Sequence, residues 1–157
     1  DQLRESTGLS VTWFAFHANQ DANLLQTLNE QGLVPNRLEA NSSTIIAKNI
    51  EHAQDIFSDA SLVIAMRLHA LILSIVSQCP TVGLSYDPKV EAAARTADVP
   101  WLDLTHLPNL ERVVLQWKEC MSHSPATSRL QNIRQQAYEH EIALRSSLKG
   151  LQKRNLI

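Results

Sequence analysis

The stretch from Leu62 to Lys89 constrains the fold more than any other part of this chain. Residues 62–66 form an apolar run with the length and branching expected of a buried strand. A second apolar block, residues 70–76, fits a buried helix, which Pro80 follows and prevents from continuing. Residues 81–84 then predict another short strand. The order strand, helix, strand indicates a βαβ unit with two parallel strands.

Charged and titratable residues follow each of these two strands. Arg67 and His69 come after the first strand, and Lys89 comes after the second. Asp87 can N-cap a helix that begins at Pro88, so Lys89 belongs to its first turn. Neighbouring parallel strands end at the same edge of a sheet, where open α/β folds bind ligands, and helix N-termini there favour anions. We therefore expect Arg67, His69 and Lys89 to converge on a small phosphate or carboxylate ligand.

The rest of the chain continues the alternation of strands and helices. Residues 1–10 are polar and predict a linker or the end of a cut element. The pattern predicts an α/β fold, a Rossmann-like parallel sheet flanked by helices, in a single domain over residues 1–157 with a C-terminal helical extension over 125–157. The remaining expected elements are strands at 11–16, 36–40 and 100–104, a turn at 41–43, helices from about 21 to 32, 50–59, 90–97 and 110–121, a polar break at 122–127 and a long helix from 128 to about 153.

Composition excludes several classes of protein. The chain has 157 residues, is 44% hydrophobic and carries a net charge of −2, which fits a globular domain without a general attraction to nucleic acid. No apolar run reaches the roughly 20 residues of a membrane span. No signal peptide is evident, and a start without Met indicates a fragment or processed chain. Cys79 and Cys120 lack metal-ligand spacing and fit free thiols in the cytoplasm.

Each candidate site residue also has an ordinary structural interpretation. Arg67 could cap a strand end at the surface, yet an arginine directly after a buried strand is unusual unless it faces a cleft, and its planar fork suits a carboxylate or phosphate. His69 could be a core histidine, or it could bind an anion and pass a proton. Lys89 could be solvated, although a cation is a poor choice in the first turn of a helix. We favour the ligand-binding interpretation for all three.

Other polar residues near the same edge are more ambiguous. Ser85 and Tyr86 could hydrogen-bond a ligand or simply pack. His17 lies after the strand at 11–16 and could assist proton transfer, whereas Asp21 is better explained as a helix N-cap. The remaining histidines show no ligand spacing and are interpreted as surface or structural residues: His52, His106, His123 and His140.

Two segments of the central stretch resemble a known family. Residues 66–70 (MRLHA) and 80–90 (PTVGLSYDPKV) are similar to the C-terminal signature of the polysaccharide pyruvyl transferases, most closely the bacterial branch that modifies cell-wall polysaccharide for S-layer anchoring. A weaker likeness extends from about Val11 to about Leu104. The resemblance implies that this chain is the C-terminal, donor-binding half of a fold like that of the GT-B glycosyltransferases.

The resemblance also implies a reaction and roles. The family transfers a pyruvyl group from phosphoenolpyruvate (PEP) to two sugar hydroxyls as a ketal and releases phosphate. Arg67 and His69 match the PEP-binding arginine and histidine, and Lys89 matches the site lysine. His69, or less readily His17, would supply the proton. PEP is a substrate, and the resemblance calls for no cofactor and no metal.

The resemblance further suggests the partners. The acceptor would be a lipid-linked or polymeric saccharide in the cytoplasm. The N-terminal, acceptor-binding half of such enzymes has no counterpart here, so we expect weak PEP binding and little turnover by this domain alone. The basic residues near the C-terminus fit either peripheral contact with anionic lipid or a solvated helix end: Lys149, Lys153 and Arg154.

Two other functions stay open at this point. A glycosyltransferase or nucleotide-sugar epimerase of the same fold would bind UDP at the same edge, with Glu91 as the candidate ribose contact. The four glycines form no GxGxxG or P-loop, so a dinucleotide cradle is not expected. A non-catalytic module that binds a protein or polysaccharide would be favoured if Trp13, Trp101 and Trp117 were exposed.

Overall fold

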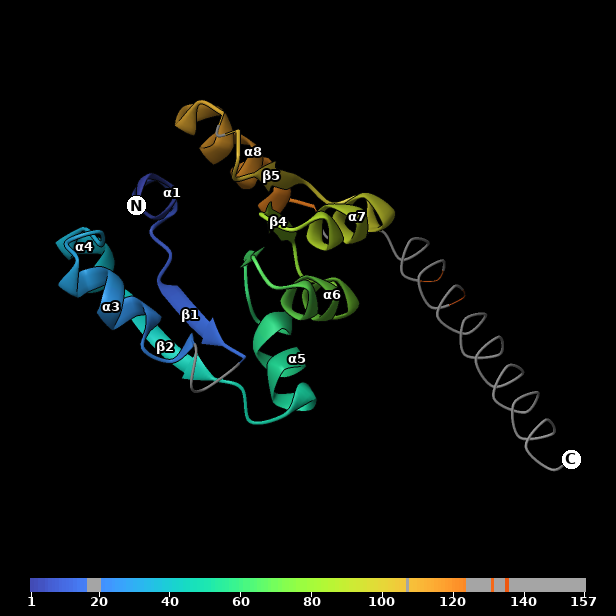
Figure 1. Ribbon diagram of the computed structural model, residues 1–157, viewed down its shortest axis with the longest axis horizontal. Coiled ribbons are helices and arrows are strands. Elements are labelled where there is room, and N and C mark those ends of the chain that lie inside the picture. The colour runs from blue at the N-terminus through green and yellow to red at the C-terminus, as the bar shows by residue number, and fades with distance from the viewer. Residues whose placement is uncertain (17–20, 107, 124–130, 132–134, 136–157) are drawn as a thin grey trace, which may run out of the picture.

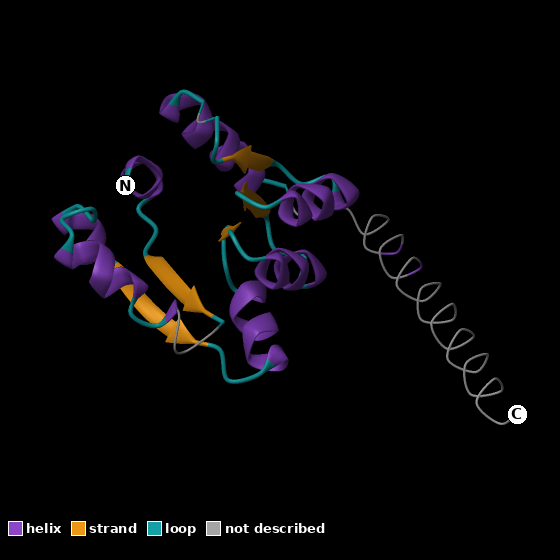
Figure 2. Ribbon diagram, in the orientation of Figure 1, coloured by secondary structure: helices purple, strands orange, loops and turns teal. Residues whose placement is uncertain are grey.

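The computed structural model describes residues 1–16, 21–106, 108–123, 131 and 135. Within these residues the chain alternates strands and helices, and the strands lie between the helices (Figures 1 and 2). The helices are α1 (Gln2–Thr7), α3 (Leu24–Glu30), α4 (Asn36–Glu39), α5 (Ile50–Ser58), α6 (Leu68–Val76), α7 (Pro88–Ala97) and α8 (Leu110–Met121).

The strands form two parallel sheets. Strands β1 (Val11–Ala15) and β2 (Ser42–Ile46) pair with each other. Strands β3 (Val63–Ala65), β4 (Thr81–Ser85) and β5 (Trp101–Asp103) form the second sheet, with β4 in the centre. The expected α/β class, with parallel strands flanked by helices in a Rossmann-like arrangement, is confirmed. Within the described residues, hydrogen bonding divides the strands into these two sheets.

The predicted βαβ unit is present. Strand β3 leads into α6, which returns the chain to β4, and the two strands pair in parallel with Ala65 opposite Gly83. Helix α7 then begins at Pro88, and the Asp87 carboxylate accepts a hydrogen bond from the Lys89 backbone N–H at 2.8 Å. This is the predicted N-cap, and it fixes where the second helix begins.

Two local predictions are wrong. Residues 36–40 contain the helix α4 rather than a strand, and the strand β2 starts at Ser42 inside the segment predicted as a turn. The Ser42 hydroxyl donates to the Leu38 carbonyl at 2.7 Å, which links this helix directly to the strand. Residues 1–10, expected to be a linker or the end of a cut element, contain α1, which ends at Gly8 in the left-handed conformation (φ 72°), so the linker interpretation does not hold.

The main core lies between the helices α5 to α7 and the strands. Leu71 and Ile75 of α6 pack with Ala94 of α7 and with Ala65 of β3, all almost fully buried. Helix α6 contacts both α5 and α7, and α8 packs against β4. On the side of β1, Phe14 and Phe16 extend this core towards α5. The loops that leave β3 and β4 therefore begin at this packed core.

The predicted helix from residue 128 to about 153, and with it the C-terminal extension over 125–157, lies outside the described residues. In the part of the chain that is described, no helix is long and apolar enough to cross a bilayer.

Candidate functional site

The candidate site lies where β3 and β4 end. Arg67 occupies the N-cap position of α6 in extended conformation (φ −93°, ψ 137°), and His69 belongs to the first turn of this helix. Lys89 occupies the first turn of α7, next to its cap Asp87. Because β3 and β4 are parallel neighbours, the two loops and the two helix starts meet at one edge of the sheet.

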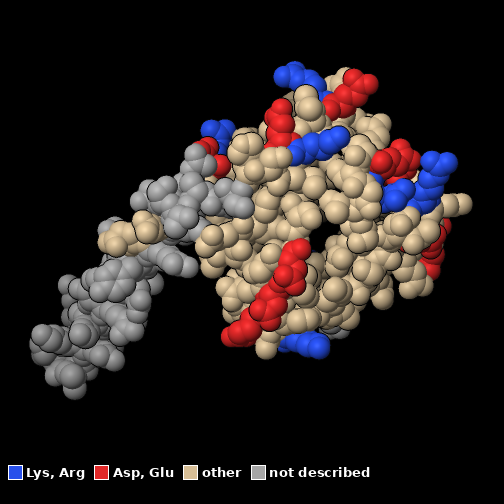
Figure 3. All heavy atoms as spheres, turned by 180° about the vertical axis from the view of Figure 1, so that it is seen from behind, with Lys and Arg blue, Asp and Glu red and all other residues tan. Residues whose placement is uncertain are grey.

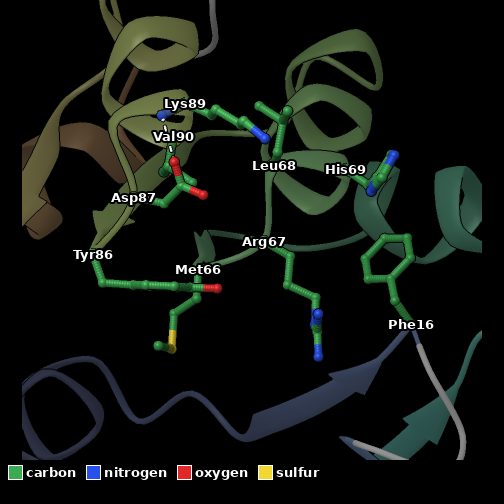
Figure 4. A pocket seen from close by; sticks show the side chains of 9 residues that line it. All are labelled: Phe16, Met66, Arg67, Leu68, His69, Tyr86, Asp87, Lys89 and Val90. Atoms are coloured by element: carbon green, nitrogen blue, oxygen red, sulfur yellow. Dashed lines mark hydrogen bonds between the residues drawn. The ribbon is translucent and has the colours of Figure 1, made fainter.

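A pocket of about 220 Å³ lies between these two loops. Three of the sequence-predicted residues with a cationic or titratable group line it together: Arg67, His69 and Lys89. Figure 4 shows the Lys89 side chain reaching from α7 towards the start of α6, near Leu68. The rest of the pocket's lining comprises Phe16, Met66, Leu68, Tyr86, Asp87 and Val90.

The two helix starts at the pocket differ in capping. The carboxylate of Asp87 occupies the start of α7. The start of α6 receives no side-chain cap from the described residues, because a guanidinium at Arg67 has no acceptor to offer its N–H groups. Unpaired N–H groups and the helix dipole favour an anion at this end. The start of α6 therefore adds backbone donors to the cations of the pocket.

Arg67 forms an ion pair with Asp21. The Arg67 Nη2 and Asp21 Oδ1 atoms are 2.5 Å apart, and the side chains are 37% and 16% exposed. Asp21 was interpreted from the sequence as a helix N-cap, but the N-cap residue of α3 is Asn23, so that interpretation is wrong. Sequence reasoning missed this contact because 46 positions separate the two residues.

The other predicted site residues occupy different surroundings. Tyr86 lines the pocket and is 61% exposed. Ser85 is buried, does not line the pocket, and donates its hydroxyl to the Asp87 carbonyl at 3.0 Å. His69 is exposed at the pocket. His17 lies outside the described residues.

A second polar cluster lies at the end of β5. Asp103 accepts hydrogen bonds from the backbone N–H of Thr105 at 2.8 Å and from its hydroxyl, and it pairs with His106 Nδ1 at 3.2 Å. The hydrogen bonds from Thr105 are the main reason that the pKa of Asp103 is lowered. His106 is 87% exposed here, which agrees with its interpretation as a surface residue.

Figure 3 shows how charged side chains are distributed over one face of the molecule. In the view of Figure 3, acidic and basic side chains are interspersed, apart from one acidic stripe, and no broad basic patch covers this face. Among the described residues, no group of three or more His, Cys, Asp or Glu side chains is arranged to hold a metal ion.

Fold and site together define a Rossmann-like domain with a pocket, lined in part by Arg67, His69 and Lys89, at the carboxyl ends of two parallel strands. The sequence model of the polysaccharide pyruvyl transferases matches residues 1–88, more than half of the 157 residues. The chain belongs to the polysaccharide pyruvyl transferase family. The match includes Arg67, His69 and Tyr86 and ends one residue before Lys89. No curated protein sequence and no solved structure matches the chain.

Proposed function

We propose that the pocket between α6 and α7 binds the donor PEP, and that the enzyme transfers its pyruvyl group to a saccharide as a ketal. The observation that carries this proposal is the pocket itself, which Arg67, His69 and Lys89 line together in a member of this family. PEP is small and carries two anionic groups, a carboxylate and a phosphate. Two cations and a helix start offer one partner or more for each of them.

The chemistry makes two demands on the protein. PEP must be protonated at C3 while positive charge develops at C2, where the two sugar hydroxyls add and phosphate leaves. In this proposal Arg67 and Lys89 neutralise the anionic groups, and His69 donates the proton. His69 has the access for this role because it is exposed at the pocket. His17 is the second candidate for the proton donor.

The acceptor is proposed by family membership alone. We propose a lipid-linked or polymeric saccharide of the cell wall or an exopolysaccharide, modified in the cytoplasm, with S-layer anchoring as the biological context closest to the sequence likeness. A part of the enzyme outside this domain would bind the acceptor. We therefore propose binding of PEP, rather than turnover, as the property to measure on this chain.

Calorimetric titration of PEP into the wild type and into Arg67→Ala and Lys89→Gln tests the proposal. Each substitution should weaken PEP binding at least about tenfold, because each removes a charged hydrogen-bond donor. Lys89→Gln should preserve the fold, since Asp87 caps the backbone N–H of residue 89 and not its side chain. Lys118→Gln, on the exposed face of α8, is the matched control and should bind PEP like the wild type.

Two results would refute the donor assignment. One is equal PEP affinity in the wild type and Arg67→Ala. The other is the absence of PEP binding by the wild type; thermal stabilisation by UDP would then select a nucleotide-sugar enzyme. Glu91, the candidate ribose contact for such an enzyme, instead pairs with Arg95 at 2.8 Å and does not line the pocket. A module that binds through exposed tryptophans gains no support, because Trp13, Trp101 and Trp117 are all half-buried.

A further inference from the structure

The ion pair between Arg67 and Asp21 occupies the arginine that the proposed donor needs. It is a charge-assisted contact between a guanidinium and a carboxylate, a class of contact that is stronger than a hydrogen bond between neutral groups. Asp21 precedes α3, which belongs to the half of the chain that contains β1 and β2, whereas Arg67 follows β3. Figure 4 shows the Arg67 side chain extending away from Lys89, in the direction of β1. The guanidinium is thus held by a carboxylate of the protein on the side opposite Lys89.

The charges around the pocket do not suit an anionic ligand as they stand. Among the described residues, Arg67 and Lys89 contribute two positive charges, and Asp87 and Asp21 contribute two negative charges, so the formal sum of these four charges is zero. A ligand with both a carboxylate and a phosphate brings at least two further negative charges. Asp87 is tied to the start of α7 as its cap. The carboxylate that can give way is therefore Asp21.

We infer that Asp21 is a resident counter-anion, whose place at Arg67 a carboxylate or phosphate group of the ligand must take. The inference rests on the proposed function, because it concerns the same arginine. Asp21 is only 16% exposed, so its charge needs compensation while no ligand is bound, and Arg67 contributes to it. Arg67 is 37% exposed, so part of its side chain is accessible to an incoming anion. Asp21 thereby lowers anion affinity and keeps the site neutral when it is empty.

The alternative role for Asp21 is to orient Arg67 permanently. The two roles predict opposite effects of removing the carboxylate. If Asp21 competes with the ligand, its removal makes Arg67 more available to the ligand and strengthens anion binding. If Asp21 orients Arg67, its removal leaves the guanidinium without a fixed orientation and weakens anion binding.

The experiment titrates PEP and, separately, inorganic phosphate into the wild type and Asp21→Asn. We expect Asp21→Asn to bind both anions about tenfold more tightly, the effect of removing one competing charged contact. Asp55→Asn makes the same chemical change on the exposed face of α5 and should shift neither affinity. In an Arg67→Ala background, Asp21→Asn should have no effect, because the competition acts through Arg67. Asp21→Ser serves if the asparagine variant does not fold.

Weaker or unchanged phosphate affinity in Asp21→Asn overturns the inference, and so does a failure of either protein to bind phosphate. Tighter phosphate binding with no PEP binding by either protein would uphold the inference and refute the proposed donor instead.

Discussion

Cys79 is the residue whose ionisation is most clearly changed by the fold. It is 2% exposed, and its Sγ lies 3.1 Å from the Ala60 carbonyl oxygen. Burial, with the neighbouring Cys120 as a second cause, raises the pKa of the Cys79 thiol from 9.0 to about 11. The protonated thiol is therefore the form that the folded protein prefers.

This shift predicts a loss of stability in base. Below pH 9.0 both folded and unfolded chains keep the thiol protonated, and the full stability is present. Between pH 9.0 and about 11 only the unfolded chain releases the proton, so the free energy of unfolding should fall, by up to about 1.4 kcal/mol per pH unit from this group.

Urea unfolding of the wild type and Cys79→Ala across this range checks the prediction. Lysines and tyrosines titrate in both proteins, so the difference between their two slopes isolates Cys79. Cys79→Ala should lose less stability with rising pH than the wild type. Equal slopes would contradict the raised pKa.

Some residues at the pocket can be predicted from the sequence, and others cannot. The sequence predicts the proximity of Arg67, His69 and Lys89, because each follows a strand of one local βαβ unit. The position of Asp21 could not be predicted, because its partner is 46 positions away and follows a strand of the other sheet. A carboxylate before a helix is usually a cap, and only tertiary structure shows that this one pairs with the guanidinium.

Gly83 controls how closely the elements around β4 approach each other. A Cβ added at this buried residue would lie 3.3 Å from the Trp101 Cβ of β5 and 3.5 Å from the Val90 Cγ1 of α7. Trp101 is directly opposite Gly83 in the strand pairing, so its Cβ has little freedom to withdraw. The absence of a side chain at 83 thus allows α7 to lie close to the sheet.

Gly83→Ala should therefore destabilise the protein by about 1–3 kcal/mol, the usual cost of an extra methyl group in a packed core. Urea unfolding measures the change. Ser43→Ala, at an exposed position of β2, should stay within about 0.5 kcal/mol of the wild type. A neutral Gly83→Ala would mean that α7 can shift outwards at no cost.

Segments with a strong local sequence pattern form the predicted helices and strands, whereas a segment with a weak pattern does not. The helix at 110–121 has the predicted bounds, because its apolar spacing is regular and Asn109 caps it. Residues 41–46 combine turn formers with the β-branched Thr44, Ile45 and Ile46. Pairing with β1, in which Val11 lies opposite Ser42, extends the strand back through the serines. Tertiary contact therefore overrides local preference in this segment.

For the whole molecule, the sequence indicated parallel strands between helices but could not indicate the division into two sheets. Each βαβ connection is short and local, so parallel pairing of β3 with β4 follows from the pattern. Whether β1 also joins that ladder depends on side chains that meet across long separations. Among the described residues, the contacts between the two halves of the fold include an aromatic cluster and the ion pair of Asp21 with Arg67.

The aromatic cluster is built on Phe57 of α5. Phe57 is 3% exposed, and its ring centroid lies 4.9 Å from that of Phe14 and 6.3 Å from that of Phe16. Phe14 belongs to β1 and Phe16 follows that strand, whereas α5 packs on α6 beside the second sheet (Figure 1). Phe57 thus provides an apolar contact between the two halves of the fold.

Phe57→Ala should cost about 3–5 kcal/mol of unfolding free energy, and the loss should be uneven. Amide hydrogen exchange should rise more in β1 and β2 than in β4, because β4 keeps α7 and β5 on either side. Phe57→Leu fills most of the space and should preserve the protection of β1. Equal loss of protection in both sheets of Phe57→Ala would mean that the sheets unfold as one unit. In that case the two sheets would be separate in their hydrogen bonding but would unfold together. Asp21 and Arg67 would then belong to one cooperative unit.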